Sequence, residues 1–361
     1  MEFYKIKVDK VIQETEQSVS VGFKLDKEHP IRTYSPGQYL TLRYDMQGEK
    51  FLRCYSFSSL PTDEYLTFTV KKTKHGFISR ELVENIAAGM ELEVASPQGK
   101  FKVKRNDTQR TSHYFFAAGS GITPILSMIR FILEEDASSK VFLLYSNKKE
   151  EEIIFYNTLK DLQIKYQGQI EVFFTLTGEK NSLLQKIFNK SKTEWSGWKG
   201  RVDDKLIEKF FEEIQDKNKN REYYICGPGK FINNIEKILQ QKNIANSNIH
   251  KEYFTVTQEK NSSKKNDPQL LPEAVLSFSL KGQKNTIKTL HGEKILEALI
   301  REGYDPPYSC SSGACSSCVA KKISGEIIMD SSLALDDSEI KEGYILTCQS
   351  RCVSEQVEIE Y

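Results

Sequence analysis

The sequence predicts a multidomain α+β protein, with a β-barrel at the N-terminus, a parallel-sheet α/β domain in the centre and a small mixed domain at the C-terminus. Three patterns support this prediction: short alternating strands at the start, strands alternating with amphipathic helices in the middle, and crowded cysteines at the end. The chain has 361 residues, enough for two or three domains of ordinary size. We expect domains at residues 1–107, 108–255 and 274–361, with a linker at 256–273.

The composition is typical of a globular protein, with 39% hydrophobic and 28% charged residues. Because 51 Lys and Arg residues balance 50 Asp and Glu residues, nucleic acid and anionic membrane are excluded as the main partners. The N-terminal segment MEFYKIKVDK lacks the apolar core of a signal peptide, so we expect a cytoplasmic protein. The apolar stretch at 114–133 contains two glycines, a proline and an arginine, which favour a buried strand, a turn and a helix over a membrane span.

Periodicity supports the first two domains. The strands expected in the all-β first domain, which is a barrel or sandwich, are Glu2–Lys10, Ser18–Leu25, Tyr39–Tyr44, Leu66–Lys72 and Glu91–Ala95. The central domain is expected to have strands at Tyr114–Ala117, Lys140–Tyr145, Glu171–Leu176 and Glu222–Cys226, and helices at Ile153–Leu162, Leu206–Ile214 and Phe231–Gln240. The polar segment 257–272 predicts a linker that either lets the last domain swing or is a plain solvated tether.

The cysteines carry the clearest chemical signal. Seven are present, and five of them, Cys310, Cys315, Cys318, Cys348 and Cys352, fall within residues 310–361. The first three follow the pattern C-x4-C-x2-C, which with one distant cysteine is the plant-type spacing of a [2Fe–2S] cluster. The residues between them are small, so the backbone can wrap closely and point N–H groups at sulfur. A zinc site is the alternative, although structural zinc usually takes short-spaced cysteine pairs on both sides. The spacing leaves open whether Cys348 or Cys352 is the fourth ligand.

The surroundings of these cysteines predict a small mixed unit. Its expected strands are Ala274–Leu280, Thr286–Leu290, Tyr344–Thr347 and Val353–Glu360. Its expected helix is Glu293–Glu302, with Ile295, Leu296, Leu299 and Ile300 on the inner face. The segments PYSCSSGACSSC and TCQSR, at 307–318 and 347–351, resemble plant-type ferredoxins, most of all those fused to flavin reductases. This resemblance covers residues 274–361, implies a β-grasp fold, and assigns Cys310, Cys315, Cys318 and Cys348 as the metal ligands.

Two segments of the first domain suggest flavin chemistry. Arg53-Cys54-Tyr55-Ser56 offers an arginine for a phosphate, an aromatic ring for stacking and a hydroxyl for a ring nitrogen, although such a tetrapeptide is also common in ordinary strands. His75-Gly76-Phe77-Ile78-Ser79 predicts a turn that leads into a helix, and a helix N-terminus is a natural phosphate site.

Two segments of the central domain suggest dinucleotide binding. Ala118-Gly119-Ser120-Gly121-Ile122-Thr123-Pro124 follows an expected strand and opens a helix, so its glycines allow the backbone to approach a pyrophosphate. It differs from the Rossmann fingerprint because Pro124 takes the place of the third glycine. Cys226-Gly227-Pro228 ends another strand, at the edge where open α/β sheets bind ligands. A plain strand-to-helix turn and a buried structural cysteine are the alternatives.

In this order the four segments resemble the ferredoxin–NADP reductase superfamily over residues 1–254. With its ferredoxin module, the chain is similar to the reductase components of bacterial multicomponent oxygenases, most of all the phenylacetyl-CoA epoxidase (ring monooxygenase) reductase family. The resemblance implies a Greek-key barrel that binds FAD, with FMN less favoured, a domain that binds NADPH or NADH, and a [2Fe–2S] cluster. It also implies a partner protein that accepts single electrons, such as a diiron or Rieske oxygenase.

The resemblance further implies roles for single residues. Arg53 and the turn at Gly76–Ser79 would hold the flavin phosphates, Tyr55 would stack on the flavin ring, and Ser56 would hydrogen-bond near its N5 atom. The glycines of 119–124 would face the pyrophosphate. Cys226 would lie beside the nicotinamide, Glu252 would belong to the hydride-transfer pocket, and Phe254 would lie near the flavin.

The choice of dinucleotide depends on two loops in which the chain departs from its relatives. After the strand that ends near Tyr145, the sequence continues Ser146-Asn147-Lys148-Lys149, where relatives often carry Asn-Arg. After Phe174 it continues with residues 175–179, TLTGE, where relatives that use NADPH often carry Ser-Arg. Lys148, Lys149 and Lys180 can pair with a 2′-phosphate, which favours NADPH over NADH, or they form an ordinary solvated rim.

Three functions compete at this stage. NAD(P)H gives two electrons at once, a [2Fe–2S] cluster takes one, and a flavin can do both, so the order of modules favours an oxygenase reductase. A stand-alone diaphorase or flavin reductase would not need the cluster domain. A redox sensor would not need the dinucleotide segments.

Overall fold

The computed structural model describes residues 2–46, 48–73, 76–103, 110–178, 195–254 and 270–361. The chain forms two compact units. The larger contains Glu2–Phe51 and Tyr55–Glu252, and the smaller contains the chain from Tyr253 onward together with Leu52–Cys54. Within the described ranges, no helix combines the length and the apolar character needed to cross a membrane. The expected linker at 256–273 lies outside these ranges except for its last four residues.

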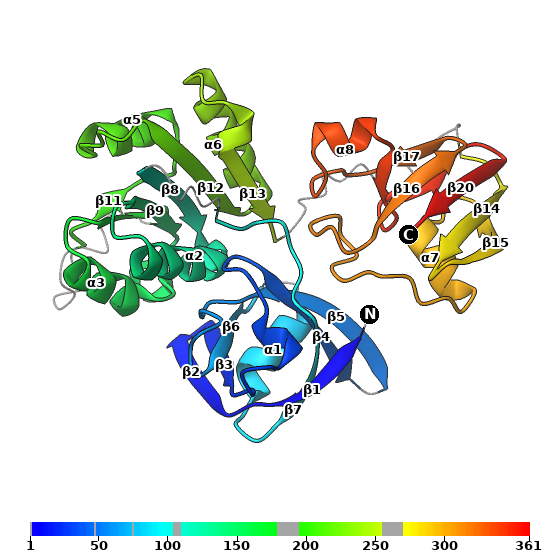
Figure 1. Ribbon diagram of the computed structural model, residues 1–361, viewed down its shortest axis with the longest axis horizontal. Helices are drawn as coiled ribbons and strands as arrows, with labels where there is room; N and C mark the ends of the chain where they lie inside the picture. Colours follow the sequence, from blue (N-terminus) through cyan, green and yellow to red (C-terminus); the bar gives the residue numbers. More distant parts are fainter. Residues whose placement is uncertain (1, 47, 74–75, 104–109, 179–194, 255–269) are drawn as a thin grey trace, which may run out of the picture. The chain divides into compact units, whose positions relative to one another are not determined.

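The N-terminal part of the larger unit is a β-barrel of two sheets that share one core (Figure 1). The first sheet has the order β1-β7-β4-β5, with β1 at Phe3–Lys7, β4 at Tyr39–Met46, β5 at Glu49–Ser56 and β7 at Glu91–Ala95. The second has the order β2-β3-β6, at Lys10–Thr15, Ser18–Phe23 and Leu66–Lys71. Helix α1, Phe77–Asn85, packs against β6.

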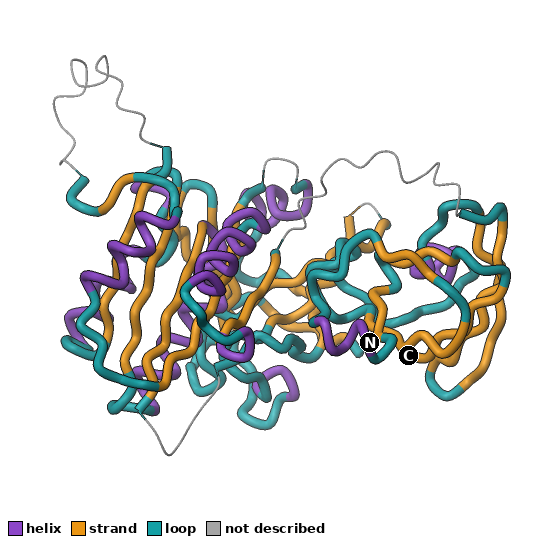
Figure 2. Tube along the Cα trace, turned by 90° about the horizontal axis from the view of Figure 1, so that it is seen from above, coloured by secondary structure: helices purple, strands orange, loops and turns teal. Residues whose placement is uncertain are grey.

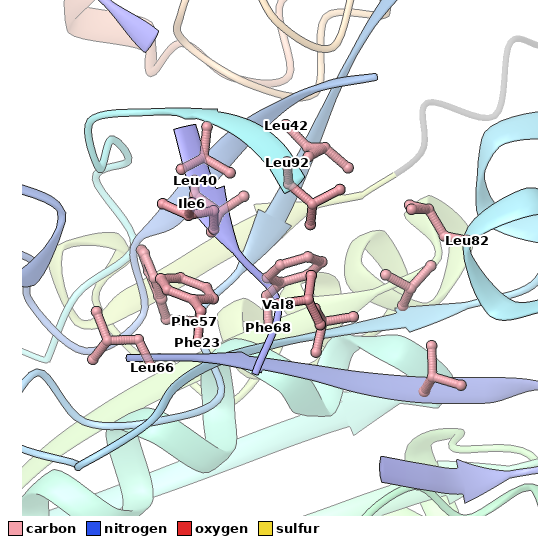
Figure 3. Packing of buried hydrophobic residues seen from close by; sticks show 14 of the residues in the cluster. Ile6, Val8, Phe23, Leu40, Leu42, Phe57, Leu66, Phe68, Leu82 and Leu92 are labelled. Atoms are coloured by element: carbon pink, nitrogen blue, oxygen red, sulfur yellow. The ribbon is translucent and has the colours of Figure 1, made fainter. Parts of the chain in front are cut away.

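Aromatic and aliphatic side chains from both sheets fill the barrel core (Figure 3). Phe23, Phe57 and Phe68 are fully buried there, and Leu82 of α1 joins them. Burial of each such side chain contributes roughly 1.5–3 kcal/mol, so this core is a main source of the stability of the domain.

One expected strand of the barrel is wrong. The sequence predicts a single strand over Glu2–Lys10, but β1 ends at Lys7 and β2 begins at Lys10. Between them the chain changes partners: Val8 N–H donates to Met90 O, and Asp9 N–H donates to Gly22 O in the other sheet. The crossing closes the barrel, and it depends on pairing with distant strands that apolar periodicity does not reveal.

The central part of the larger unit is a six-stranded sheet in the order β11-β10-β9-β8-β12-β13. Its strands are β8 at Thr111–Ala118, β9 at Lys140–Asn147, β10 at Ile170–Leu176, β11 at Trp198–Lys199, β12 at Asn220–Gly227 and β13 at Ile249–Tyr253 (Figure 2). Strands β8 to β12 pair in parallel. Helices α2 (Ile122–Glu135) and α3 (Tyr156–Lys165) lie on one face, and α5 (Asp204–Glu213) and α6 (Gly229–Gln241) lie on the other (Figure 1).

The apolar stretch at 114–133 forms most of strand β8 and helix α2, as the sequence predicts. The helix expected at Ile153–Leu162 is misplaced, because α3 begins only at Tyr156. Phe155 precedes it in the left-handed region, with φ of 61°, and Glu150–Glu152 form a short 3₁₀ turn. A left-handed residue interrupts the helical hydrogen bonds, so the helix cannot extend back to Ile153.

The smaller unit is a mixed sheet in the order β15-β14-β20-β16-β18, with β17 and β19 paired separately. Its strands are β14 at Glu273–Leu280, β15 at Gln283–Leu290, β16 at Val319–Ser324, β17 at Ile327–Met329, β18 at Tyr344–Leu346, β19 at Ser350–Cys352 and β20 at Gln356–Glu360. Helix α7, Ile295–Arg301, packs on β15 and β19, and α8, Asp337–Lys341, packs on β18. The antiparallel β14–β15 pair and the parallel β14–β20 pair agree with the expected β-grasp arrangement.

The inner face of α7 differs from the expected one at a single position. Ile295, Leu296 and Leu299 are buried as predicted, but Ile300 is 43% exposed and Ala298 takes the inner position instead. The helix has only seven residues and ends at Arg301. The buried stripe therefore still has four residues, but it ends at Leu299 instead of Ile300.

Candidate active site and metal centre

The segments Gly119–Pro124 and Cys226–Pro228 meet at the carboxyl edge of the central sheet. Strand β8 has β9 on one side and β12 on the other, so the chain leaves β8 in one direction and later returns on its opposite side. Open α/β sheets bind ligands at such a reversal. At Gly121 an added Cβ would lie 2.1 Å from the Cys226 carbonyl oxygen. The glycine is therefore needed for the two loops to pack closely.

The loop after β8 presents backbone rather than side chains. Gly119 has φ of 55°, a conformation that favours glycine, and its carbonyl accepts a 2.9 Å hydrogen bond from the Tyr145 hydroxyl. No described side chain caps the N-terminus of α2, whereas the side chains of Ile122, Thr123 and Pro124 are buried. Together with Ser120, which is half-buried, this loop can offer N–H groups to a pyrophosphate.

Three predicted catalytic residues converge from separate elements of the larger unit. Ser56, at the end of β5, donates through Oγ to Glu252 Oε2 of β13 at 3.4 Å. Burial raises the pKa of the Glu252 carboxyl to about 8, and the Ser56 hydrogen bond opposes this rise. Cys226, at the end of β12, is fully buried, and burial, then the nearby Glu252 carboxylate, raise the pKa of its thiol. At neutral pH all three side chains are thus uncharged.

The predicted flavin residues lie on β5 and at the start of α1. Arg53 is exposed, Cys54 is half-buried, and the Tyr55 ring stacks on Phe68 with centroids 5.4 Å apart. Gly76 is the N-cap of α1, a helix start that no side chain of the described residues caps.

The turn before α1 is tight. Ser79 Oγ donates to the Gly76 carbonyl at 3.0 Å, and a Cβ at Gly76 would lie 2.0 Å from Thr73 Oγ1. Phe77 is 65% exposed beside this turn, and His75 lies outside the described residues. An uncapped helix start beside an exposed ring fits a bound dinucleotide.

The loops at the ends of β9 and β10 are joined by backbone hydrogen bonds. Gly178 N–H donates to the Lys148 carbonyl at 2.9 Å, and Thr177 N–H donates to the Asn147 carbonyl at 2.8 Å. Asn147 is buried, and its side-chain amide has no hydrogen-bond partner among the described residues, as expected of a group that a ligand or water completes. Lys148 and Lys149 are exposed. Lys180 lies outside the described ranges, and Phe254 is half-buried directly after β13.

The four predicted ligands lie together in the smaller unit as two pairs. The sulfur of Cys310 neighbours that of Cys315, and the sulfur of Cys318 neighbours that of Cys348. Among the described residues, no three His, Cys, Asp or Glu side chains converge as they would on one ion. Two thiolate pairs fit two irons better than a single tetrahedral zinc.

The loop that carries three of these cysteines turns tightly and directs a backbone N–H group at sulfur, as its small residues predict. Ser311 and Gly313 have φ of 53° and 79°, and Ser312 N–H points at the Cys310 sulfur at 3.4 Å. Interaction with Cys315, followed by burial, raises the pKa of the Cys310 thiol. Crowded, buried thiols resist ionisation unless a cation shares their charge, so the donor set fits a [2Fe–2S] cluster.

Cys352 lies apart from both pairs. It belongs to β19 and packs in the domain core with Ala274 and Ile287. Burial raises the pKa of its thiol to about 11, and a hydrogen bond with Thr289 opposes this. The packing therefore favours Cys348 as the fourth ligand.

Several contacts near the site have no counterpart in the sequence patterns. Lys71 of β6 pairs with Glu152 at 3.3 Å, and its amine lies 4.0 Å from an added Cβ at Gly119. Arg130 of α2 makes two hydrogen bonds to Asp63, at 2.5 and 2.9 Å, which join the barrel to the central sheet. Only folding brings such distant residues together, and neither spacing nor composition could have indicated them.

The fold and the two sites define a flavin- and iron–sulfur-dependent oxidoreductase. Residues 5–103 match the model of the oxidoreductase FAD-binding domain, residues 115–237 that of the oxidoreductase NAD-binding domain, and residues 278–353 that of the 2Fe-2S iron-sulfur cluster binding domain. The chain thus has domains for FAD, a nicotinamide dinucleotide and a [2Fe–2S] cluster.

Relatives of the full length extend this assignment. The ferredoxin reductase component of 3-ketosteroid-9-alpha-monooxygenase from Mycolicibacterium smegmatis is 33% identical over 99% of this chain and 96% of its own length. A component of 1,2-phenylacetyl-CoA epoxidase from Escherichia coli is 29% identical over 99% of this chain and 98% of its own. A solved phthalate dioxygenase reductase has the same fold, with a TM-score of 0.62 at 20% identity, covering 99% of this chain and 98% of its own. The chain belongs to the family of reductase components of oxygenase systems.

Proposed function

We propose that this chain takes electrons from NAD(P)H and delivers them singly to a partner oxygenase. The observation that carries the proposal is the pairing of two sites in one chain: a buried cluster of Ser56, Glu252 and Cys226 beside the dinucleotide loops, and a separate domain with two cysteine pairs. FAD held by the barrel would supply the link between a donor of electron pairs and an acceptor of single electrons.

The residues of the pocket orient the reactants and keep water out. The loops at Gly119–Pro124 and Cys226–Pro228 hold the dinucleotide backbone and set the position of its nicotinamide ring. Cys226 adds a small, neutral wall, because its thiol stays protonated. Ser56 Oγ and Glu252 Oε2 form a hydrogen-bonded pair through which a proton can pass at a carboxyl that is still protonated at neutral pH. Hydride transfer itself requires no general base, so the main contribution of the pocket is geometry.

Other residues are proposed to hold the cofactors. Arg53 and the start of α1 at Gly76–Ser79 bind the flavin phosphates, while Tyr55 stacks on the ring. The side-chain amide of Asn147, which has no hydrogen-bond partner among the described residues, hydrogen-bonds to the dinucleotide. Lys148 and Lys149, both exposed at the end of β9, favour a 2′-phosphate and hence NADPH.

For the partner we propose an oxygenase of the phenylacetyl-CoA epoxidase type, a diiron enzyme. The end-to-end match to a component of such a system supports this assignment. The match to a ketosteroid monooxygenase reductase favours a steroid oxygenase as the second candidate. Reconstitution of the purified chain with the oxygenase subunits of each system, with NADPH or NADH as donor, separates the two by which product forms.

Electron flow is tested by removing the cluster alone. A Cys310→Ser variant should lose rapid cytochrome c reduction, while ferricyanide reduction at the flavin continues. Unchanged cytochrome c reduction would show that the cluster is not on the path.

A further inference from the structure

Gln349, which directly follows Cys348, is a buried amide at the metal centre. It is 1% exposed. Its Nε2 donates to the Cys348 carbonyl at 2.7 Å and lies 3.5 Å from the Cys348 sulfur. The same nitrogen lies 3.5 Å from the Ser311 carbonyl of the loop that bears the other three cysteines. One side chain therefore touches both parts of the ligand set.

The backbone and the neighbours of Gln349 fix this side chain in place. Its N–H donates to the Leu346 carbonyl at 2.8 Å, and its carbonyl accepts from Asp330 N–H at 2.9 Å. On the other side Gly313 packs against it, and an added Cβ there would lie 2.8 Å from Gln349 Cγ. Gly313 also has φ of 79°, so a glycine is required on both counts. The Gln349 backbone is thus held by two hydrogen bonds, and the cysteine loop lies directly against its side chain.

The chemistry of these contacts gives the amide a preference for one redox state. Nε2 carries two hydrogens, and the short bond to the Cys348 carbonyl uses one of them. The second faces the Ser311 carbonyl and the Cys348 sulfur. A ligand sulfur becomes more negative when its cluster is reduced, so a donor beside it binds the reduced state more strongly.

We propose that Gln349 is a positioning residue of the [2Fe–2S] centre, which clamps the cysteine loop to the Cys348 segment and raises the potential of the cluster. Hydrogen bonds from backbone N–H groups to the sulfurs can form whatever the side chains are, whereas the donor Nε2 is present only with a side chain such as that of Gln349. The inference rests on the ligand set proposed above, Cys348 included.

The test compares side chains of similar size in the full chain after anaerobic reconstitution. Gln349→Met keeps the length of the side chain and removes the donor, and Gln349→Glu replaces the donor with a negative acceptor. Gln356→Met, at an exposed position of β20, is the matched control. Iron and labile sulfide are counted, and the midpoint potential is measured by a titration followed by electron paramagnetic resonance.

We expect full cluster content in Gln349→Met and a reduction equilibrium about tenfold less favourable, which is about 59 mV for one electron. Gln349→Glu should shift further in the same direction, and Gln356→Met should not shift. Equal potentials in parent and Gln349→Met would overturn the inference, as would loss of the cluster from both Gln349 variants, because the role would then be assembly alone. Cys348→Ser, prepared alongside, tests the ligand set separately.

Discussion

The proposed metal centre and the proposed hydride-transfer site are assembled in opposite ways. Three of the four proposed cluster ligands lie within nine residues of sequence, Cys310 to Cys318, on one loop of small residues. Ser56 and Glu252 are 196 residues apart, and a strand of the barrel and the last strand of the central sheet bring them together. The first site depends on local backbone conformation, and the second on how whole domains pack.

This difference predicts how each site fails. A local site should lose its metal when one ligand changes, while the rest of the chain stays folded. A site assembled from distant elements should lose geometry gradually, in proportion to the displacement of its elements. The contacts that join the barrel to the central sheet, such as the ion pair of Arg130 with Asp63, therefore also help to assemble the second site.

The largest effect is expected from a ligand exchange in the cluster domain. Cys348→Ser should abolish the cluster and lower cytochrome c reduction by about a hundredfold or more, because a serine oxygen replaces a thiolate ligand. Ferricyanide reduction should persist. Iron content and both activities are measured.

The matched control for this exchange is Cys352→Ser. That side chain lies in the core with Ala274 and Ile287, so the change should cost stability, about 1–3 kcal/mol, but leave two irons per chain. Iron loss from Cys352→Ser with retention in Cys348→Ser would reverse the ligand assignment.

The second prediction displaces the assembled pocket. Gly121→Ala would place a Cβ 2.1 Å from the Cys226 carbonyl oxygen, so the two dinucleotide loops must separate. A shift of about 1 Å can cost about a hundredfold in rate, and overpacking costs about 1–3 kcal/mol of stability. Stopped-flow reduction of the flavin by NAD(P)H should slow, with cluster content unchanged.

Gly22→Ala in β3 is the control for this prediction, because the new methyl group would make only ordinary contacts, the nearest at 3.4 Å. Equal rates of flavin reduction in Gly121→Ala and Gly22→Ala would show that the close approach of the loops does not shape the pocket.

The same contrast explains what the sequence could and could not predict. The ligand spacing, the glycine turns and most strands are local patterns, and the structure has them close to the expected bounds. The crossing at Val8 and Asp9, the left-handed Phe155 and the pairing of Lys71 with Glu152 depend on residues far away in sequence. Only a family resemblance predicts the residues proposed for hydride transfer, because no local pattern links Ser56 to Glu252.

The third prediction uses the raised pKa of Glu252. The folded carboxyl, with a pKa of about 8 against 4.5 for the ordinary group, holds a proton that the unfolded chain loses between these values. The contribution of this carboxyl to the free energy of unfolding is therefore most favourable below pH 4.5, and it is lost as the pH rises through 8. Glu252→Gln stays neutral and keeps an acceptor for Ser56. It should be more stable than the parent by about 4–5 kcal/mol at about pH 9, and equally stable near about pH 4.

In the same variant, flavin reduction should slow by about tenfold at pH 7, and any dependence of its rate on an ionisation near pH 8 should disappear. Rates measured from about pH 6 to about pH 9 test this. A pH profile identical to that of the parent would assign the ionisation to another group.

The smallest effect concerns His113, on β8 of the same sheet. Burial is the main reason why its pKa falls to about 4 from 6.5, and its ring stacks near Tyr224 with centroids 6.0 Å apart. The unfolded chain takes up a proton below pH 6.5, whereas the folded chain does not until about pH 4. The contribution of the His113 ring to the free energy of unfolding is therefore most favourable above pH 6.5, and it is lost as the pH falls from 6.5 to about 4. The smaller unit has only His291, which is exposed, so this acid sensitivity should be confined to the larger unit.

His113→Phe tests this difference between the units, because it keeps a ring and removes the titration. In urea unfolding followed by flavin release, it should match the parent at about pH 7.5 and exceed it by about 1 kcal/mol at about pH 6. Unfolding of the smaller unit, followed by cluster absorbance, should not differ between the two proteins at either pH. The prediction would be contradicted if acid lowered the stability of both units of the parent equally and His113→Phe restored the stability of neither. The two units would then not differ in acid sensitivity.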